Sequence, residues 1–187
     1  SDRAVIYFGG NAEDVYYNAA DFRETLPGYT NYLVNYRGYG GSSGSPTEAG
    51  LFADALRIYD QLNERHASVT VIGRSLGSGI ATYLASERDV YRLILVSPHD
   101  SALSVAQSMY PVYPVSLLLK DRYESNRYAP KIKAPTLSVM AEHDRVIPRR
   151  HSSRLAEAFD PGLVEQVVIS EAGHNGLSGY RAYWDAF

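Results

Sequence analysis

The stretch Val69-Thr-Val-Ile-Gly-Arg-Ser-Leu-Gly-Ser-Gly79 combines a run typical of a buried strand, a glycine-rich turn and the start of a helix. Within it, Gly73-Arg-Ser-Leu-Gly77 fits G-x-S-x-G, a pattern that places a serine on a strained strand-to-helix turn at the end of a sheet. Glycines are expected where strand and helix pack closely. An ordinary turn can have a similar composition. To interpret Ser75 as a nucleophile, we therefore look for a base, an acid and oxyanion-stabilising donors elsewhere in the chain.

Strand-like runs alternate with helical patterns on both sides of this stretch. Helices between the strands indicate right-handed βαβ crossovers, a mostly parallel sheet and helices on both faces, that is, a three-layer α/β/α sandwich. The predicted strands cover residues 4–8, 32–36, 69–72, 92–97, 135–140 and 163–169, and the predicted helices cover residues 13–26, 47–62, 76–84, 148–159 and 176–187.

The segment from residue 98 to residue 134 interrupts this alternation. It is longer than a simple crossover requires and contains four prolines, at positions 98, 111, 114 and 130. We therefore expect residues 1–187 to form one domain in which residues 98–134 are an elaborated crossover or a small lid. Tyr110 and Tyr113 in this segment are candidates for lining a pocket.

Composition excludes several classes of function. The net charge of −3 and the absence of a lysine-arginine run argue against a nucleic-acid surface. The absence of cysteine excludes disulfides, thiolate metal sites and a cysteine nucleophile, and leaves the redox compartment undetermined. No apolar run approaches the roughly 18 residues that span a membrane. We expect no cofactor and no metal; the oligomeric state stays open, and the cytoplasm is slightly favoured, with an upstream targeting or anchoring segment not excluded.

The best candidate for the base is His174, one of five histidines. It stands in a turn-rich loop directly after the last predicted strand, at the sheet edge where open α/β sheets bind their ligands. His99 and His143 also follow strands and are further candidates. We expect His66, at a helix end, to face solvent and His151 to sit on a surface helix.

The best candidate for the acid is Asp144, which follows the predicted strand at 135–140. Its competitor is Asp100, after the preceding strand, while Glu142 and Glu171 are weaker candidates. Asp144 also fits a helix cap ahead of Pro148. The chain order Ser75, Asp144, His174 is the order found in α/β-hydrolases.

Two backbone N–H groups are candidates for an oxyanion hole. Leu76 follows the candidate nucleophile at the start of its helix. The second donor is expected in the loop after the first strand, at Asn11 with Gly10 as the alternative. If residues 32–36 and 69–72 lie on opposite sides of residues 4–8, the strand order reverses there and these loops flank a crevice.

Five segments together resemble a serine α/β-hydrolase. They are most similar to the compact, small-lidded branch grouped with serine-aminopeptidase-like hydrolases and with α/β-hydrolase-domain acyl esterases and depalmitoylases. The segments are Phe8-Gly-Gly-Asn-Ala-Glu-Asp-Val15, Asn35-Tyr-Arg-Gly-Tyr-Gly-Gly-Ser-Ser-Gly-Ser-Pro-Thr-Glu48, Gly73-Arg-Ser-Leu-Gly77, Glu142-His-Asp-Arg-Val-Ile-Pro148 and Gly173-His-Asn175.

The resemblance implies a Ser75–His174–Asp144 triad, an oxyanion hole at Leu76 and the loop of Gly10 and Asn11, and acyl transfer to water without a cofactor. We expect a small acyl ester or thioester as substrate; an aminopeptidase-like amidase and a non-catalytic ligand-binding protein are the alternatives. The chain departs from the family pattern in having Gly9-Gly10 in place of His-Gly. It also lacks the two strands that usually precede the first one, which predicts a trimmed or minimal member.

Overall fold

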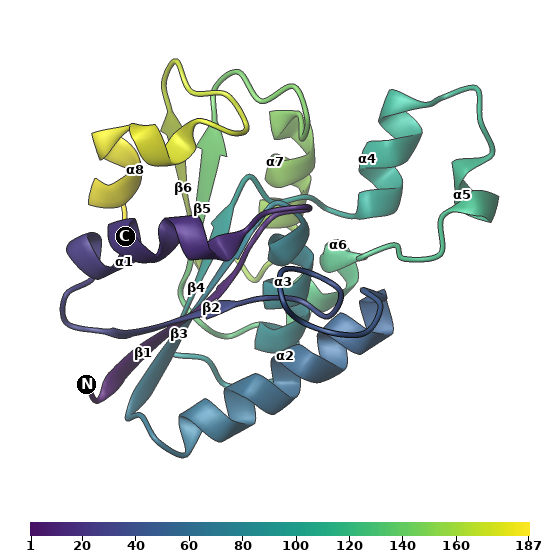
Figure 1. The fold of residues 1–187 in the computed structure, drawn as a ribbon. Helices are drawn as coiled ribbons and strands as arrows, with labels where there is room; N and C mark the ends of the chain where they lie inside the picture. Colours follow the sequence, from purple (N-terminus) through teal and green to yellow (C-terminus); the bar gives the residue numbers. More distant parts are fainter.

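The computed structural model describes all 187 residues and contains one parallel sheet of six strands in the order β2-β1-β3-β4-β5-β6 (Figure 1). The order reverses between β1 and β3, as expected, so the loops that follow these two strands flank one crevice. The predicted α/β class is confirmed. The strands are β1 (Arg3–Phe8), β2 (Thr30–Val34), β3 (Ser68–Arg74), β4 (Arg92–Val96), β5 (Thr136–Ala141) and β6 (Val164–Ile169).

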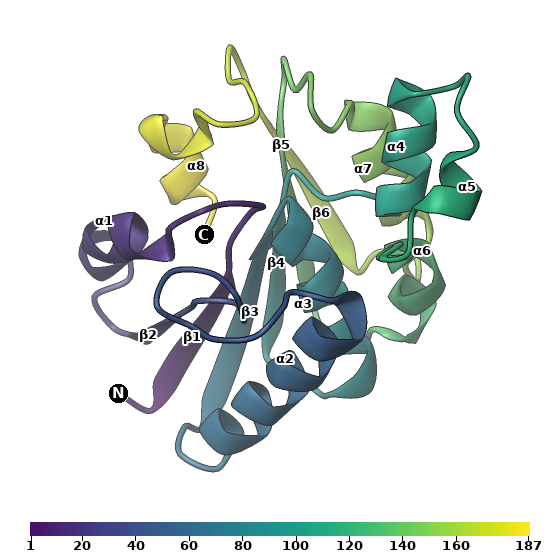
Figure 2. The same ribbon diagram turned by 45° about the vertical axis from the view of Figure 1, so that its right-hand side comes forward.

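The helices form a layer on each face of the sheet (Figures 1 and 2). Successive side chains of a strand point to opposite faces, so that Ile6 of β1 belongs to one hydrophobic cluster and Tyr7 to the other. The first cluster is covered by α2 (Glu48–Asn63), α3 (Leu76–Glu87) and α7 (Arg149–Glu157), and the second by α1 (Ala19–Thr25) and α8 (Arg181–Asp185).

The predicted elements differ from the structure mainly in three places. The first helical segment divides into a 3₁₀ turn, η1 (Val15–Asn18), and α1, and the last divides into η3 (Leu177–Gly179) and α8. Strand β2 ends at Val34 instead of residue 36, because Val34 pairs with Phe8, the last residue of β1. Tyr36 is buried beyond the strand and donates a hydrogen bond of 2.7 Å from its hydroxyl to Gly9 O.

The segment between β4 and β5 consists of short helical pieces. α6 (Ser125–Tyr128) and η2 (Ala129–Lys131) pack against α3, and Ala129 lies in the first core cluster. By contrast, α4 (Ala102–Met109) and α5 (Val115–Leu118) contain no buried residue. The description of residues 1–187 as one domain with an elaborated crossover or lid at 98–134 stays a prediction. No helix is long and apolar enough to cross a bilayer.

The first turn of α3 lies against the end of β1. A Cβ atom on Gly77 would collide with the carbonyl oxygen of Phe8, and one on Gly73 would come within 2.6 Å of the Ala81 Cβ. Neither glycine has room for a side chain, as the sequence pattern predicted. This close approach places the loop after β1 directly beside the turn between β3 and α3.

We expect Gly77→Ala to lower the free energy of unfolding by about 3 kcal/mol, because backbone atoms of β1 would have to move to admit the methyl group. The matched control is Gly41→Ala, since nothing lies within 4 Å of a Cβ at Gly41. Urea unfolding of both variants measures the difference. Equal stability of the two variants would show that the β1–α3 contact is looser than described.

Candidate active site

Ser75 occupies a strained turn between β3 and α3. Its φ of 51° and ψ of −113° are values that residues with a side chain rarely adopt. The turn is fixed on both sides: Ser75 N–H donates to Val96 O at 2.9 Å, and Ser75 O accepts hydrogen bonds from the N–H and the hydroxyl of Ser78 at 2.9 and 2.6 Å. Backbone contacts therefore determine where the Ser75 hydroxyl lies.

The structure brings His174 and Asp144 to this hydroxyl from the loops after β6 and β5. His174 Nε2 lies 3.1 Å from Ser75 Oγ, and His174 Nδ1 lies 2.7 Å from Asp144 Oδ2. An ionised carboxylate only accepts hydrogen bonds, so His174 carries its proton on Nδ1. Nε2 is then free to accept the proton of the Ser75 hydroxyl.

The Asp144 carboxylate contacts two different segments. It does not cap α7, whose N-terminus at Pro148 has no side-chain cap. Its Oδ1 accepts hydrogen bonds from the N–H groups of Val146 and Ile147 at 2.9 and 2.7 Å, ahead of α7, while Oδ2 faces His174. Burial alone would raise the pKa of Asp144, but the hydrogen bonds from His174 and Ile147 outweigh burial and hold this pKa below its ordinary value. Asp144 is therefore ionised at neutral pH.

Asp100, the competing acid, lies in a separate cluster. Its Oδ1 is 2.9 Å from Nδ1 of His151, whose Nε2 is 3.2 Å from Ser108 Oγ on α4. His151 lies on α7, and its side chain is 1% exposed because α4 packs over it. The cluster has the connectivity of a serine–histidine–aspartate triad, but Ser108 lies within a helix and not on a strained turn.

The remaining histidines do not reach Ser75. His99 is buried, and burial lowers its pKa to about 4, so it is neutral at pH 7. His66 was predicted to face solvent but is half-buried and bonds to Tyr32 and Ser1.

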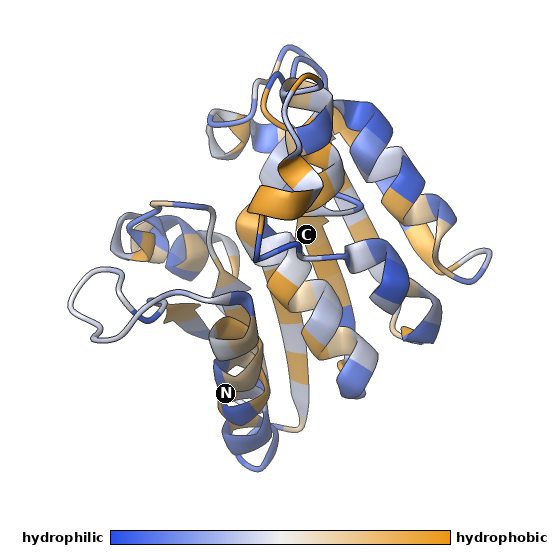
Figure 3. Cartoon of the chain, turned by 90° about the vertical axis from the view of Figure 1, so that its right-hand side faces the viewer, coloured by the Kyte–Doolittle hydropathy of each residue, from blue (hydrophilic) through white to orange (hydrophobic).

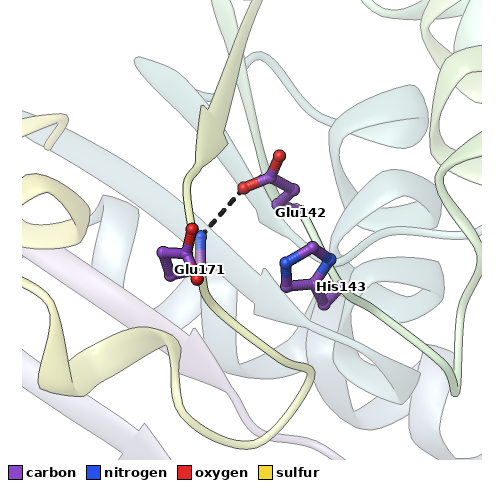
Figure 4. A group of neighbouring side chains, drawn as sticks. All are labelled: Glu142, His143 and Glu171. Atoms are coloured by element: carbon purple, nitrogen blue, oxygen red, sulfur yellow. Dashed lines mark hydrogen bonds between the residues drawn. The ribbon is translucent and has the colours of Figure 1, made fainter.

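His143 is exposed and forms a group with Glu142 and Glu171 at the adjacent ends of β5 and β6 (Figure 4). Their nitrogen and carboxylate atoms lie within 4.8 Å of one another, which suits a metal ion in ligand type. All three side chains are exposed, and Glu142 already accepts a hydrogen bond from Glu171 N–H at 2.9 Å. We therefore assign no metal to this group.

The loop after β1 distinguishes the two alternatives for the second oxyanion donor. Gly10 N–H donates to Glu13 Oε2 at 2.5 Å, whereas the N–H groups of Asn11 and Leu76 form no hydrogen bond within the protein. The Asn11 side chain is held by the Tyr39 hydroxyl, which donates to its Oδ1 at 2.7 Å. Asn11 is thus the residue of this loop whose N–H is free to bind a ligand oxygen.

Glu13 connects the loops around Ser75, and we did not anticipate it from the sequence. Besides the Gly10 N–H, its carboxylate accepts hydrogen bonds from Tyr7, Asn18 and Arg74, at 2.7, 2.6 and 2.6 Å. Burial would raise the pKa of Glu13, but these bonds and the Arg74 charge prevail and lower it. No periodicity or motif indicates this pairing, because Glu13 and Arg74 are 61 residues apart in the chain.

Arg74 extends the connection to the His174 loop. While Nη1 bonds to Glu13, Nη2 donates to His174 O at 3.2 Å and to Asn175 Oδ1 at 3.3 Å. These contacts brace the loops around Ser75. Through this one side chain the loop after β1, the turn at Ser75 and the loop after β6 are connected.

Several proteins are similar to this chain in sequence. The uncharacterized protein Rv2307c of Mycobacterium tuberculosis is 36% identical over 182 residues, which are 94% of this chain and 64% of that protein. The alpha/beta hydrolase domain-containing protein 17C of Xenopus tropicalis is 31% identical over 81% of this chain and 49% of its own length. The chain thus spans less than two thirds of these relatives.

Solved structures share the fold at low sequence identity. Est1E from Butyrivibrio proteoclasticus, solved with ferulic acid, has a TM-score of 0.80 at 16% identity and covers 99% of this chain and 85% of its own. Monoacylglycerol lipase from Paleococcus ferrophilus has a TM-score of 0.73 at 19% identity, with 97% and 92% covered. A family profile described as alpha/beta hydrolase fold matches residues 3–114. The chain belongs to the alpha/beta hydrolase fold family.

Proposed function

We propose that this chain is a serine hydrolase that cleaves an acyl ester or thioester through Ser75, His174 and Asp144. The observation that carries the proposal is the continuous contact from Asp144 to His174 to Ser75, at 2.7 and 3.1 Å, with the serine on a strained turn. Membership of the alpha/beta hydrolase fold family supports hydrolase activity. No cofactor is required for this chemistry.

In the acylation half of the proposed reaction, Ser75 Oγ attacks the substrate carbonyl carbon while His174 Nε2 takes its proton. The carbonyl π electrons move to oxygen, and the N–H groups of Leu76 and Asn11 stabilise the resulting oxyanion. One such donor contributes about 3 to 4 kcal/mol to the transition state. Collapse of the tetrahedral intermediate breaks the bond to the leaving group, which receives the proton from His174.

In the deacylation half, water replaces the leaving group. His174 Nε2 takes a proton from the water as its oxygen attacks the acyl carbon, and the same two N–H groups stabilise the second oxyanion. The bond between the acyl carbon and Ser75 Oγ then breaks, and His174 returns the proton to Ser75. Throughout both halves Asp144 keeps its negative charge beside His174 and stabilises the imidazolium.

Ester or thioester cleavage fits the insertion better than aminopeptidase activity. An aminopeptidase needs an acidic group to bind the substrate ammonium, and residues 101–119 contain no charged residue. The carboxylates on either side of this run, Asp100 and Asp121, already have partners. Asp100 contacts His151 at 2.9 Å, and Asp121 accepts a hydrogen bond from Glu48 N–H at 3.0 Å. Turnover of p-nitrophenyl acyl esters, compared with aminoacyl anilides, distinguishes the two activities.

We expect a fluorophosphonate probe to label the folded chain at Ser75 and at no other serine. Labelling should disappear in Ser75→Ala and persist in Ser108→Ala, the matched control, because Ser108 has a similar histidine contact but no strained turn or adjacent free N–H groups. Mass spectrometry of the labelled peptide gives the position. An unlabelled wild-type chain that still binds acyl esters would identify a non-catalytic binding protein.

Asp144→Asn should lower kcat for p-nitrophenyl ester hydrolysis by roughly 10³- to 10⁴-fold, since the amide favours the wrong tautomer of His174. Asp100→Asn is the control, because Asp100 contacts His151 instead of His174. Its kcat, per mole of folded protein, should stay within the order of magnitude of the wild-type value. The reverse ranking of the two variants would assign the acid to Asp100.

Glu13→Gln should lower kcat roughly 10- to 100-fold with little change in KM, because Glu13 positions the loop that supplies the Asn11 N–H without contacting substrate. Asp60→Asn removes an exposed partner of Arg88 at the end of α3 remote from Ser75 and is the matched control. We expect no change in either constant there. A rise in KM at constant kcat in Glu13→Gln would instead place Glu13 in ground-state binding.

A further inference from the structure

The insertion between β4 and β5 contains a long uncharged run whose apolar side chains face solvent. Residues 101–119 include no Asp, Glu, Lys, Arg or His. Within this run neither α4 nor α5 buries a single residue. Val112 is 86% exposed, Leu117 84% and Leu118 68%, although large apolar side chains are ordinarily buried in such a small protein.

We call the six exposed apolar residues of this run the apolar tip: Met109, Tyr110, Val112, Tyr113, Leu117 and Leu118. In Figures 1 and 2 the connection through α4 and α5 projects away from the sheet, beside α7. Figure 3 views the molecule from the side to which α5 projects, and the short helix in front is coloured hydrophobic. All six side chains of the apolar tip are exposed. Tyr110 and Tyr113, expected as pocket residues, therefore face solvent and pack edge-to-face on each other.

The root of the insertion is held by polar contacts, so the tip projects from a fixed base. Ser108 on α4 contacts His151 on α7 at 3.2 Å. At the other end of the insertion, Arg122 N–H donates to the Glu48 carboxylate at 2.7 Å, and Glu48 N–H donates to Asp121. The exposed apolar residues lie between these two anchored ends.

Positive charges flank the tip without acidic partners. Lys120 follows α5 directly, and Arg122 donates to Ser116 O at 2.9 Å, which places its guanidinium beside α5. Helix α7, which contacts α4, begins with Arg149 and Arg150. None of these four residues forms a salt bridge. The acidic residues at the root, Asp121 and Glu48, accept backbone hydrogen bonds from Glu48 and Arg122 and form no salt bridge with these cations.

We propose that the apolar tip docks on the surface of an anionic lipid bilayer, with Lys120 and the arginines of α7 facing the headgroups. Apolar side chains that project beyond a basic margin are the pattern of proteins that lie on a membrane without spanning it. Tyrosines favour the headgroup level because one end of the ring is apolar and the other polar. Anionic headgroups supply the missing partners of the cations.

A second copy of the chain fits the tip less well. A standard protein–protein interface has about 20 to 30 residues on each side, whereas the tip offers six. Two copies joined tip to tip would also bring the same cations together. The bilayer accommodates both properties because it is large, apolar below the surface and negatively charged at it.

The test is co-sedimentation of the chain with vesicles of phosphatidylcholine alone and of equimolar phosphatidylcholine and phosphatidylserine, with size-exclusion chromatography of the same sample. We expect binding to the mixed vesicles that weakens as salt is raised. Leu117→Ser/Leu118→Ser should lower the partition coefficient about tenfold or more. Lys120→Gln should lower it about fivefold on mixed vesicles only, as expected for one basic residue.

Tyr91→Ser is the matched control, because Tyr91 is 63% exposed at the opposite end of the sheet, before β4. It should bind as the wild type does. Equal loss in Tyr91→Ser and in the double variant would overturn the proposal, as would failure of the wild type to bind either vesicle. If the wild type instead self-associates without binding vesicles, and the double variant abolishes this self-association, the tip binds a second copy of the chain. Ester turnover in solution is measured separately and is expected to persist in the double variant.

Discussion

The close approach of α3 to β1 is the constraint on which the site depends. Gly77 lies so near the carbonyl oxygen of Phe8 that no side chain fits between the helix and the strand. A helix that begins this close to the strand leaves room for only a sharp turn after β3, and Ser75 takes a positive φ there. The same contact brings the N–H of Leu76 and the loop containing Asn11 to one place. One packing contact therefore positions the proposed nucleophile and both proposed oxyanion donors together.

A buried ion pair between Glu13 and Arg74 holds the loops around Ser75 together. The three loops around Ser75 come from strands that are distant in sequence, and loops at a sheet edge are mobile unless something holds them. The Glu13 carboxylate fixes Gly10 N–H and Arg74, and Arg74 reaches the backbone of His174. Breaking such a pair leaves an uncompensated buried charge. Because both partners are more than three quarters buried, this contact resists screening by salt better than the exposed pairs do.

The sequence predicted the parallel α/β sheet, the reversal of strand order beside the first strand and the close packing at Gly73 and Gly77, because each depends on a local signal. The site residues proposed from the sequence lie close together in the structure. Gly73 and Gly77 reflect close packing, Asp144 follows the buried strand β5, and His174 follows the edge strand β6. What could not be predicted depends on contacts between distant segments. The burial of His151 requires α4 to pack over α7, and α4 lies in the insertion, where no regular period indicated its direction. The pairing of Glu13 with Arg74 is of the same kind.

In two places a serine contacts a histidine that in turn contacts an aspartate. Comparing the two places shows what a candidate nucleophile needs besides these contacts. Ser108, His151 and Asp100 repeat the connectivity at distances of 3.2 and 2.9 Å. Yet Ser108 belongs to a regular helix, where the backbone N–H groups form the helix's own hydrogen bonds. An oxyanion formed there would have no free donors. At Ser75 the strained turn leaves the Leu76 N–H without a partner. Backbone geometry, rather than the order of side-chain contacts, thus distinguishes a candidate nucleophile from a polar anchor of the insertion.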